Sequence, residues 1–413
     1  MLKFISLGCK VNSYESSALK DLFLLNGFSD KDEIIIINTC SVTAVADQKS
    51  RQIIRRERRN NQKAIIVVMG CYSQLNGEFV SSNLGADIVV GTSNRNKIVD
   101  HVKTFLKEKK PIIDVEEDSR KFKYESFGVF SMPLTTRAYI KIEDGCNNFC
   151  SYCTIPYTRG RARSRDKEEI ISEITHLIGK GYLEFVITGI HTAHYGIDLK
   201  DVTFSSLVEE ITNIKGLYRL RISSIEESEI DDHFISLLKD KECIANHLHM
   251  PLQSGSPSVL KRMRRKYNVD DFIKKIEKIR SVRPDIAITT DVIVGFPGES
   301  EEEFLETVNF IKRVNFAELH VFPFSCRKGT PAYDMPNQIS PEVKTKRVNE
   351  LIELSESLKK AYREKFIGKE LEIIVEEKDK KTGKYKGHSS NYLLLEDDLP
   401  ESSIGKIVKV KAR

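Results

Sequence analysis

Short apolar runs and amphipathic stretches alternate along the first part of the chain. The apolar runs are KFISLG (3–8), EIIIINTC (33–40), AIIVVMGC (64–71) and DIVVGT (87–92), and helical stretches such as 14–25 and 46–59 lie between them. Strands that are apolar throughout and alternate with helices are typical of a parallel sheet covered on both faces. The pattern therefore predicts a doubly wound α/β domain over residues 1–110.

The same alternation returns after a charged stretch without periodicity at 111–135, which we interpret as a linker. Six more apolar runs follow: RAYIKIEDG (137–145), LEFVITGI (183–190), YRLRISSI (218–225), NHLHMPL (246–252), IAITTDVIVGF (286–296) and AELHVFPF (317–324). Repeated strand–helix units predict a (βα) part-barrel over residues 136–365, with its chemistry at the C-terminal ends of the strands. Residues 366–413 form strand-like segments with polar turns, which predict a small β-barrel.

Composition excludes several classes of protein. The chain has 413 residues, of which 40% are hydrophobic and 30% are charged, as in globular proteins with a sizeable core. No apolar run approaches the roughly 18 residues that a membrane helix needs, and the N-terminal apolar stretch is too short for a signal peptide. We therefore expect a cytoplasmic protein with no membrane partner.

The basic residues are clustered, although the formal net charge is only +5. The clusters are Lys49, Arg51, Arg55, Arg56, Arg58 and Arg59, then Arg159, Arg161, Arg163 and Arg165, and finally Lys261, Arg262, Arg264, Arg265 and Lys266. Such clusters indicate a surface that faces a polyanion. The alternative is a set of ordinary solvated helix faces.

Three single cysteines each follow a predicted strand of the first domain: Cys9, Cys40 and Cys71. The carboxyl ends of parallel strands share one edge of a sheet, so we expect these thiols at one rim. Cysteines in a chain of this type indicate metal or redox chemistry rather than disulfides. The alternative is that the three are buried packing residues.

The motif Cys146-x3-Cys150-x2-Cys153 follows the first strand of the predicted barrel. A [4Fe–4S] cluster held by three cysteines keeps one iron without a protein ligand, and that iron can chelate S-adenosylmethionine. The alternative is zinc, which prefers four ligands. The spacing, with Tyr152 before the last cysteine, favours the cluster.

Six longer segments carry a family resemblance. They are LGCKVNSYES (7–16), NTCSVT (38–43), MGCYSQ (69–74), IEDGCNNFCSYCTIPYTRGRARSR (142–165), HLHMPLQSGS (247–256) and DVIVGFPGE (291–299). Together they resemble the radical S-adenosylmethionine methylthiotransferases over essentially the whole chain, with a C-terminal barrel like the TRAM domain. GCKVNSYES and TGIHTAHYG (188–196) are most similar to members that modify N6-threonylcarbamoyladenosine at tRNA position 37. Sibling members modify isopentenyladenosine in tRNA or an aspartate of ribosomal protein S12.

The resemblance implies two [4Fe–4S] clusters, one on Cys146, Cys150 and Cys153 and an auxiliary one on Cys9, Cys40 and Cys71. One S-adenosylmethionine would methylate a sulfide on the auxiliary cluster, and a second would supply the radical that activates C2 of the adenosine. An electron donor of the flavodoxin or ferredoxin type and a sulfur donor would be partners. Outside the family, the alternative is a zinc or iron–sulfur RNA-binding protein without radical chemistry.

Contacts to S-adenosylmethionine are expected after the barrel strands. The expected residues are Tyr152, Thr188, Gly189, Ser223, Glu226, Gln253, Gly295 and Gly298. The alternative for the short glycine-containing pieces is that they only mark turns. We assign no catalytic role to His191, His194, His247 or His249.

Phosphates of a tRNA anticodon stem-loop are the expected polyanion, bound at the rim where the two cysteine sets meet. The expected contacts are Arg51, Arg55, Arg56, Arg59, Arg159, Arg161, Arg163, Arg264 and Arg265. Arg161 and Arg163 have the alternative role of bracing a cluster electrostatically. The modified base would leave its stack, which costs little in a single-stranded loop.

Overall fold

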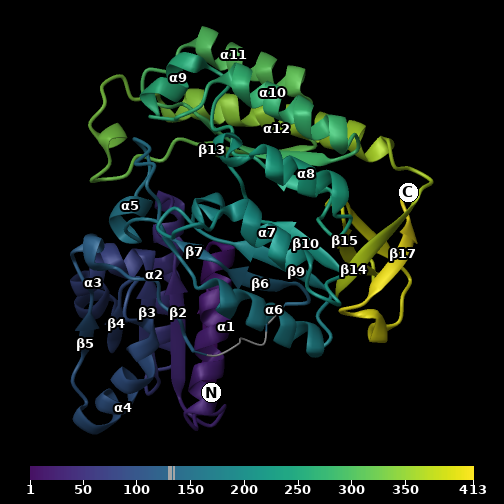
Figure 1. Cartoon of the computed structure of the whole chain (residues 1–413). Helices are drawn as coiled ribbons and strands as arrows, with labels where there is room; N and C mark the ends of the chain where they lie inside the picture. The colour runs from purple at the N-terminus through teal and green to yellow at the C-terminus, as the bar shows by residue number, and fades with distance from the viewer. Residues whose placement is uncertain (129–132, 134) are drawn as a thin grey trace.

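The computed structural model describes residues 1–128, 133 and 135–413, so part of the predicted linker (129–132 and 134) lies outside the described residues. Three units follow one another along the chain (Figure 1). None of the described helices, including the 24-residue helix α12 (Pro341–Glu364), is long and apolar enough to cross a membrane.

The first unit is a five-stranded parallel sheet in the order β1-β2-β3-β4-β5. Its elements are β1 (Leu2–Ser6), α1 (Lys10–Leu25), β2 (Ile34–Thr39), α2 (Ala44–Asn60), β3 (Ile65–Gly70), α3 (Cys71–Leu84), β4 (Ile88–Val90), α4 (Ile98–Glu108) and β5 (Ile112–Asp114). Helices cover both faces, because Phe23 of α1 packs in one core with Ile36, whereas Ile54 of α2 packs in another with Ile37. This is the α/β arrangement that the apolar runs predict.

Strand β5 corrects the predicted linker. Ile112 pairs with Ile88 of β4, so the sheet extends beyond residue 110 into the stretch that we expected to be irregular. The strand has only two apolar residues, Ile112 and Ile113, before Asp114, so it lacks the apolar run from which the other strands were predicted.

The second unit is a part-barrel of six parallel strands in two groups, β10-β9-β6 and β11-β12-β13, joined by a parallel bridge between Leu220 and Ile244. Its elements are β6 (Ala138–Lys141), β7 (Glu143–Asp144), α5 (Ile155–Thr158), β8 (Arg163–Ser164), α6 (Lys167–Gly179), β9 (Glu184–Thr188), α7 (Phe204–Thr212), β10 (Arg219–Ile222), α8 (Asp232–Asp240), β11 (His247–His249), α9 (Pro257–Arg262), α10 (Val269–Val282), β12 (Ala287–Val294), α11 (Glu301–Val314), β13 (Glu318–Pro323) and α12. Its apolar core extends to Leu351 of α12. The six strands match the six predicted apolar runs.

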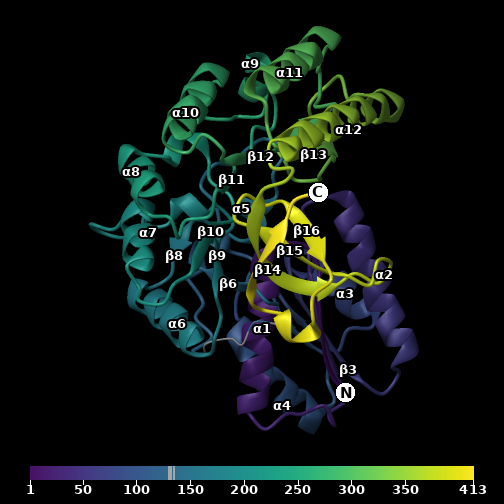
Figure 2. The same ribbon diagram turned by 90° about the vertical axis from the view of Figure 1, so that its right-hand side faces the viewer.

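The C-terminal unit is a half-barrel of four antiparallel strands in the order β16-β15-β14-β17. The strands are β14 (Glu370–Lys378), β15 (Tyr385–Ser389), β16 (Leu394–Asp397) and β17 (Ile407–Lys411). Arg221 of β10 donates hydrogen bonds to the carbonyl oxygens of Ser389 (3.0 Å) and Ser390 (3.2 Å), and Tyr392 stacks on His247 with ring centroids 4.4 Å apart. These contacts hold the half-barrel, yellow in Figure 2, against the part-barrel.

Candidate active site

One cavity of about 690 Å³ lies between the first unit and the part-barrel. All six cysteines of the two predicted sets line it: Cys9, Cys40, Cys71, Cys146, Cys150 and Cys153. Because both sets line this one cavity, the charge of Cys71 is among the causes that raise the pKa of Cys153. The fold thus brings residues more than 140 positions apart to one volume.

The backbone places the first three cysteines at the carboxyl edge of the sheet. Cys9 directly precedes α1, Cys40 follows β2, and Cys71 is the first residue of α3. Gly70, before Cys71, has φ +102°, and a Cβ there would lie 2.5 Å from the carbonyl oxygen of Thr39. Only glycine accommodates this close turn, which directs the chain straight from β3 into the cysteine.

The second set occupies the loop after β7. The amide of Cys146 donates to the carbonyl of Gly160 (3.0 Å), and the amide of Cys153 donates to the carbonyl of Cys150 (3.0 Å). Burial raises the pKa of the Cys40 and Cys153 thiols to about 12. Because a metal ligand must be the thiolate, these thiols lose their protons only when a cation binds beside them.

The donor sets fit iron–sulfur clusters better than single zinc ions. Within the described residues, neither cysteine set has all of its sulfur atoms within 4.8 Å of one another. Three thiolates on one tetrahedral zinc lie on the order of 3.8 Å apart, given Zn–S bonds near 2.3 Å. Sulfurs that bind different irons of one cluster are spaced more widely. This spacing argues against the zinc alternative.

Most of the predicted S-adenosylmethionine contacts line the same cavity. Tyr152, Thr188, Gly189, Ser223, Glu226 and Gln253 all belong to its wall. The exceptions are Gly295 and Gly298, which are not among the lining residues. A Cβ at Gly295 would lie 2.4 Å from the Lys344 side chain, so this turn packs against α12 instead. The expectation of a direct glycine contact there is not supported.

Glu226 joins two cations beside the second cysteine set. Its carboxylate lies 2.8 Å from Arg265 and 3.1 Å from His191. Burial alone would raise the pKa of Glu226, but the hydrogen bond from His191 and the charge of Arg265 lower it to about 2. The side chain of Arg265 is only 5% exposed, and its Nη1 lies 3.4 Å from the Sγ of Cys150. The Arg265 side chain is therefore already paired within the protein, and its contact with RNA phosphates stays a prediction.

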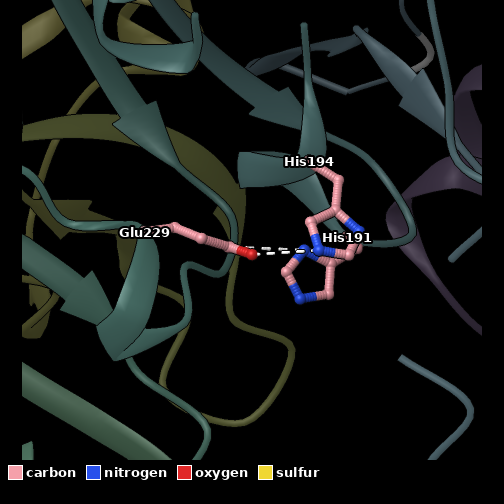
Figure 3. A group of neighbouring side chains, drawn as sticks. All are labelled: His191, His194 and Glu229. Carbon is pink, nitrogen blue, oxygen red and sulfur yellow. Dashed lines mark ion pairs between the residues drawn. The ribbon is translucent and has the colours of Figure 1, made fainter. Parts of the chain in front are cut away.

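A histidine pair borders this group. Figure 3 shows His191 and His194 with Glu229, whose carboxylate lies 3.4 Å from His191 Nδ1 and 3.1 Å from His194 Nε2. The two rings are stacked, 3.6 Å apart and inclined by 20°. An ion cannot lie in the planes of two stacked rings at once, so this is an ion-pair group rather than a metal site. The sequence did not reveal the glutamate because it lies 35 positions further along the chain.

Comparisons with known proteins agree with this geometry. Residues 140–311 match the radical SAM superfamily, and residues 1–91 match the uncharacterized protein family UPF0004. The threonylcarbamoyladenosine tRNA methylthiotransferase MtaB of Bacillus subtilis is 47% identical over 417 residues, covering 99% of this chain and 92% of the relative. The chain belongs to the methylthiotransferase family.

More distant relatives extend the comparison. The MtaB of Aquifex aeolicus is 35% identical, covering 98% of each chain. A tRNA-2-methylthio-N(6)-dimethylallyladenosine synthase of Caldicellulosiruptor saccharolyticus is also 35% identical, covering 98% of this chain and 88% of the relative. The fold resembles the radical S-adenosylmethionine methyltransferase TsrM of Kitasatospora setae, with a TM-score of 0.60 and 16% identity over 80% of this chain and 76% of that one.

The arginines after the cysteine loop of this methylthiotransferase are mostly internal. Arg159 is fully buried and pairs with Glu15 (2.9 Å) and Asp144 (3.1 Å). Arg163 is buried as well and lies 3.3 Å from Asp144. Both were expected to contact RNA, and both instead neutralise carboxylates that would be costly to bury alone. Arg161, by contrast, is exposed and lies over the ring of Phe149, 4.4 Å from its centroid.

The arginines of α2 do not all flank the cavity. The helix begins four residues after Cys40 and runs for 17 residues, which is about 25 Å at 1.5 Å per residue. Arg59, at its far end, lines a surface hollow with Met1 and Glu33 at the opposite edge of the sheet. Arg51, nearer the start of the helix, lies over the ring of Tyr72, which follows Cys71. Arg55 and Arg56 lie between Arg51 and Arg59 and are exposed. The expectation of a single rim is therefore wrong for Arg59.

Proposed function

We propose that this protein adds a methylthio group to C2 of N6-threonylcarbamoyladenosine at position 37 of tRNA. The observation that supports this most directly is that two sets of three cysteines face one cavity. Each set leaves room for one iron without a protein ligand, and the reaction needs two such positions: one for sulfur and one for S-adenosylmethionine. The relatives of matching length from Bacillus subtilis and Aquifex aeolicus bear this activity in their names, and the Bacillus subtilis protein is more similar, at 47% identity, than the dimethylallyladenosine synthase, at 35%.

The two sets of cysteines, on opposite sides of the cavity's unit boundary, would have different roles. Cys9, Cys40 and Cys71 would hold the auxiliary cluster, and Cys146, Cys150 and Cys153 would hold the cluster beside S-adenosylmethionine. When bound, the two clusters supply a sulfur atom and reductive cleavage of the cofactor, respectively. Thr188, Gly189, Ser223, Glu226 and Gln253 line the wall that would orient the cofactor.

The RNA face is proposed to use the arginines that remain exposed. These are Arg55 and Arg56 on α2, Arg161 beside the cysteine loop and Arg264 after α9, all of them exposed. Phosphates of the anticodon stem-loop would release counterions on binding them. A reduced flavodoxin or ferredoxin and a sulfur donor complete the proposed set of partners.

Mass spectrometry of nucleosides from bulk tRNA tests the proposal. The gene is expressed in a host that lacks its own methylthiotransferases but makes both N6-threonylcarbamoyladenosine and isopentenyladenosine. The expected result is a methylthio mass gain on the threonylcarbamoyl nucleoside. A gain on isopentenyladenosine would keep the reaction and replace the substrate. No gain on either would direct the search to ribosomal protein S12.

A further inference from the structure

The cavity wall contains several cationic side chains, and nearly all of them have carboxylate partners. Arg159 pairs with Glu15 and Asp144, and Arg265 pairs with Glu226 at 2.8 Å. His249 and His320 both face Asp291, at 3.3 and 3.1 Å. These charges are already compensated within the protein.

Lys10 differs from this pattern. It is the first residue of α1, next to Cys9, and it lines the cavity. Its Nζ donates a hydrogen bond to the hydroxyl of Ser223 across the cavity, at 3.2 Å. Among the described residues, no carboxylate forms an ion pair with it. Lys10 is half-buried, and an ammonium group that has lost part of its water without gaining an ion-pair partner favours binding of an anion from outside.

We infer that Lys10 forms a subsite for the carboxylate of the threonylcarbamoyl group. The inference rests on the proposed function and names how its substrate is recognised. The threonylcarbamoyl group ends in a carboxylate, whereas an isopentenyl group is an uncharged hydrocarbon. A lone lysine in the cavity therefore suits the first nucleoside and leaves an unpaired charge with the second.

The position of Lys10 suits this role. It follows Cys9 at the start of α1 and contacts Ser223 of the part-barrel, so it bridges the two units in the cavity that both cysteine sets line. In the purine ring, C2 and the C6 atom that carries the substituent are both bonded to N1. A contact that holds the carboxylate of the substituent thus also restricts where C2 lies relative to the clusters.

Binding of anticodon stem-loop RNAs to the reconstituted enzyme tests the subsite. The probes carry N6-threonylcarbamoyladenosine, the same nucleoside with its carboxylate converted to the primary amide, or unmodified adenosine at position 37. Wild-type enzyme should bind the acid at least about tenfold more tightly than the amide, as expected for a hydrogen bond between charged groups. Lys10→Gln should bind the two within about twofold, and Lys10→Arg should keep most of the preference.

Controls separate this role from others. Lys103→Gln removes the same charge from exposed α4 and should keep the wild-type ratio. A wild-type enzyme that does not distinguish acid from amide would overturn the subsite, whatever the variants do. So would a Lys10→Gln enzyme that keeps the preference or has only a higher KM for S-adenosylmethionine. If wild-type enzyme transfers no methylthio group to the acid probe, the proposed function fails instead.

Discussion

Arg159 donates a hydrogen bond from Nε to the Sγ of Cys71, at 3.3 Å, while its Nη1 lies 2.9 Å from the carboxylate of Glu15. The same guanidinium therefore connects a proposed cluster ligand to a fully buried ion-pair network. Arg95 and Lys141 complete that network around Glu15. Burial would raise the pKa of Glu15, but the surrounding cations lower it well below its usual range.

Replacing Arg159 should lower the free energy of unfolding. Arg159→Met leaves Glu15 and Asp144 buried with fewer partners, and removal of one member of such a network costs about 3–5 kcal/mol. Urea denaturation of the apoprotein measures the loss. Arg161→Met, at an exposed position in the same motif, loses only its contact with the Phe149 ring and should change the free energy of unfolding by no more than about 1 kcal/mol. Equal effects of the two variants would contradict the buried network.

Single cysteine variants should separate the two proposed clusters. Cys150→Ala and Cys71→Ala should each keep about four of about eight irons after anaerobic reconstitution. Cys150→Ala should lose cleavage of S-adenosylmethionine, whereas Cys71→Ala should keep cleavage and lose methylthio transfer. Iron analysis and 5′-deoxyadenosine measurements check both outcomes. Cys243→Ala, which lies outside the cavity lining, serves as the control. If the Cys150→Ala variant still cleaved S-adenosylmethionine, the radical site would lie elsewhere.

Salt dependence should identify the arginines that meet RNA. Arg55→Gln and Arg264→Gln should each reduce the slope of log affinity against log salt by roughly 0.7–0.9, because each removes one phosphate contact. Fluorescence anisotropy with an anticodon stem-loop at several salt concentrations gives the slope. Arg59→Gln is the matched control, since it lies on the same helix at the far edge of the sheet. A slope change for Arg59 alone would place the RNA on the wrong side of the molecule.

The ion pair between Glu303 and Arg262 should make stability depend on pH. The hydrogen bond from Arg262, at 2.6 Å, lowers the pKa of Glu303 from its ordinary 4.5 to about 2. Because this pKa is lowered by folding, the pair stabilises the protein above pH 4.5, and that stabilisation is lost as the pH falls toward 2. Glu303→Gln should cost about 1 kcal/mol at neutral pH, as for a partly exposed pair, and little near pH 2. Denaturation curves of the apoprotein at both ends of this range test it.

The cysteine sets were predictable because their placement follows from topology. Cys40 and Cys71 each come directly after an apolar strand, and the carboxyl ends of neighbouring parallel strands meet at one edge. The other three cysteines, within residues 146–153, lie close together in one loop, so their spacing can be read directly from the sequence. Local pattern was therefore sufficient to find all six thiols.

The buried charges could not be found in the same way. Arg159 and Arg163 resemble a surface basic cluster, because their partner Asp144 is one carboxylate among 60 acidic residues in the chain. The sequence RGRARSR (159–165) did carry one indication that these arginines are buried. Each arginine alternates with a small residue, which is glycine, alanine or serine. Long-range partners such as Glu15 and Arg95 depend on how the first unit packs against the part-barrel.

The C-terminal half-barrel contributes to the cavity wall that would receive the proposed RNA substrate. Tyr392 comes from this unit, yet it lines the cavity, held by stacking on His247 and by the hydrogen bonds of Arg221 nearby. The wall of the cavity is thus built by side chains from all three units. The proposed RNA substrate would meet side chains that stacking and hydrogen bonds already hold in place, so most of the conformational entropy lost on binding would come from the RNA.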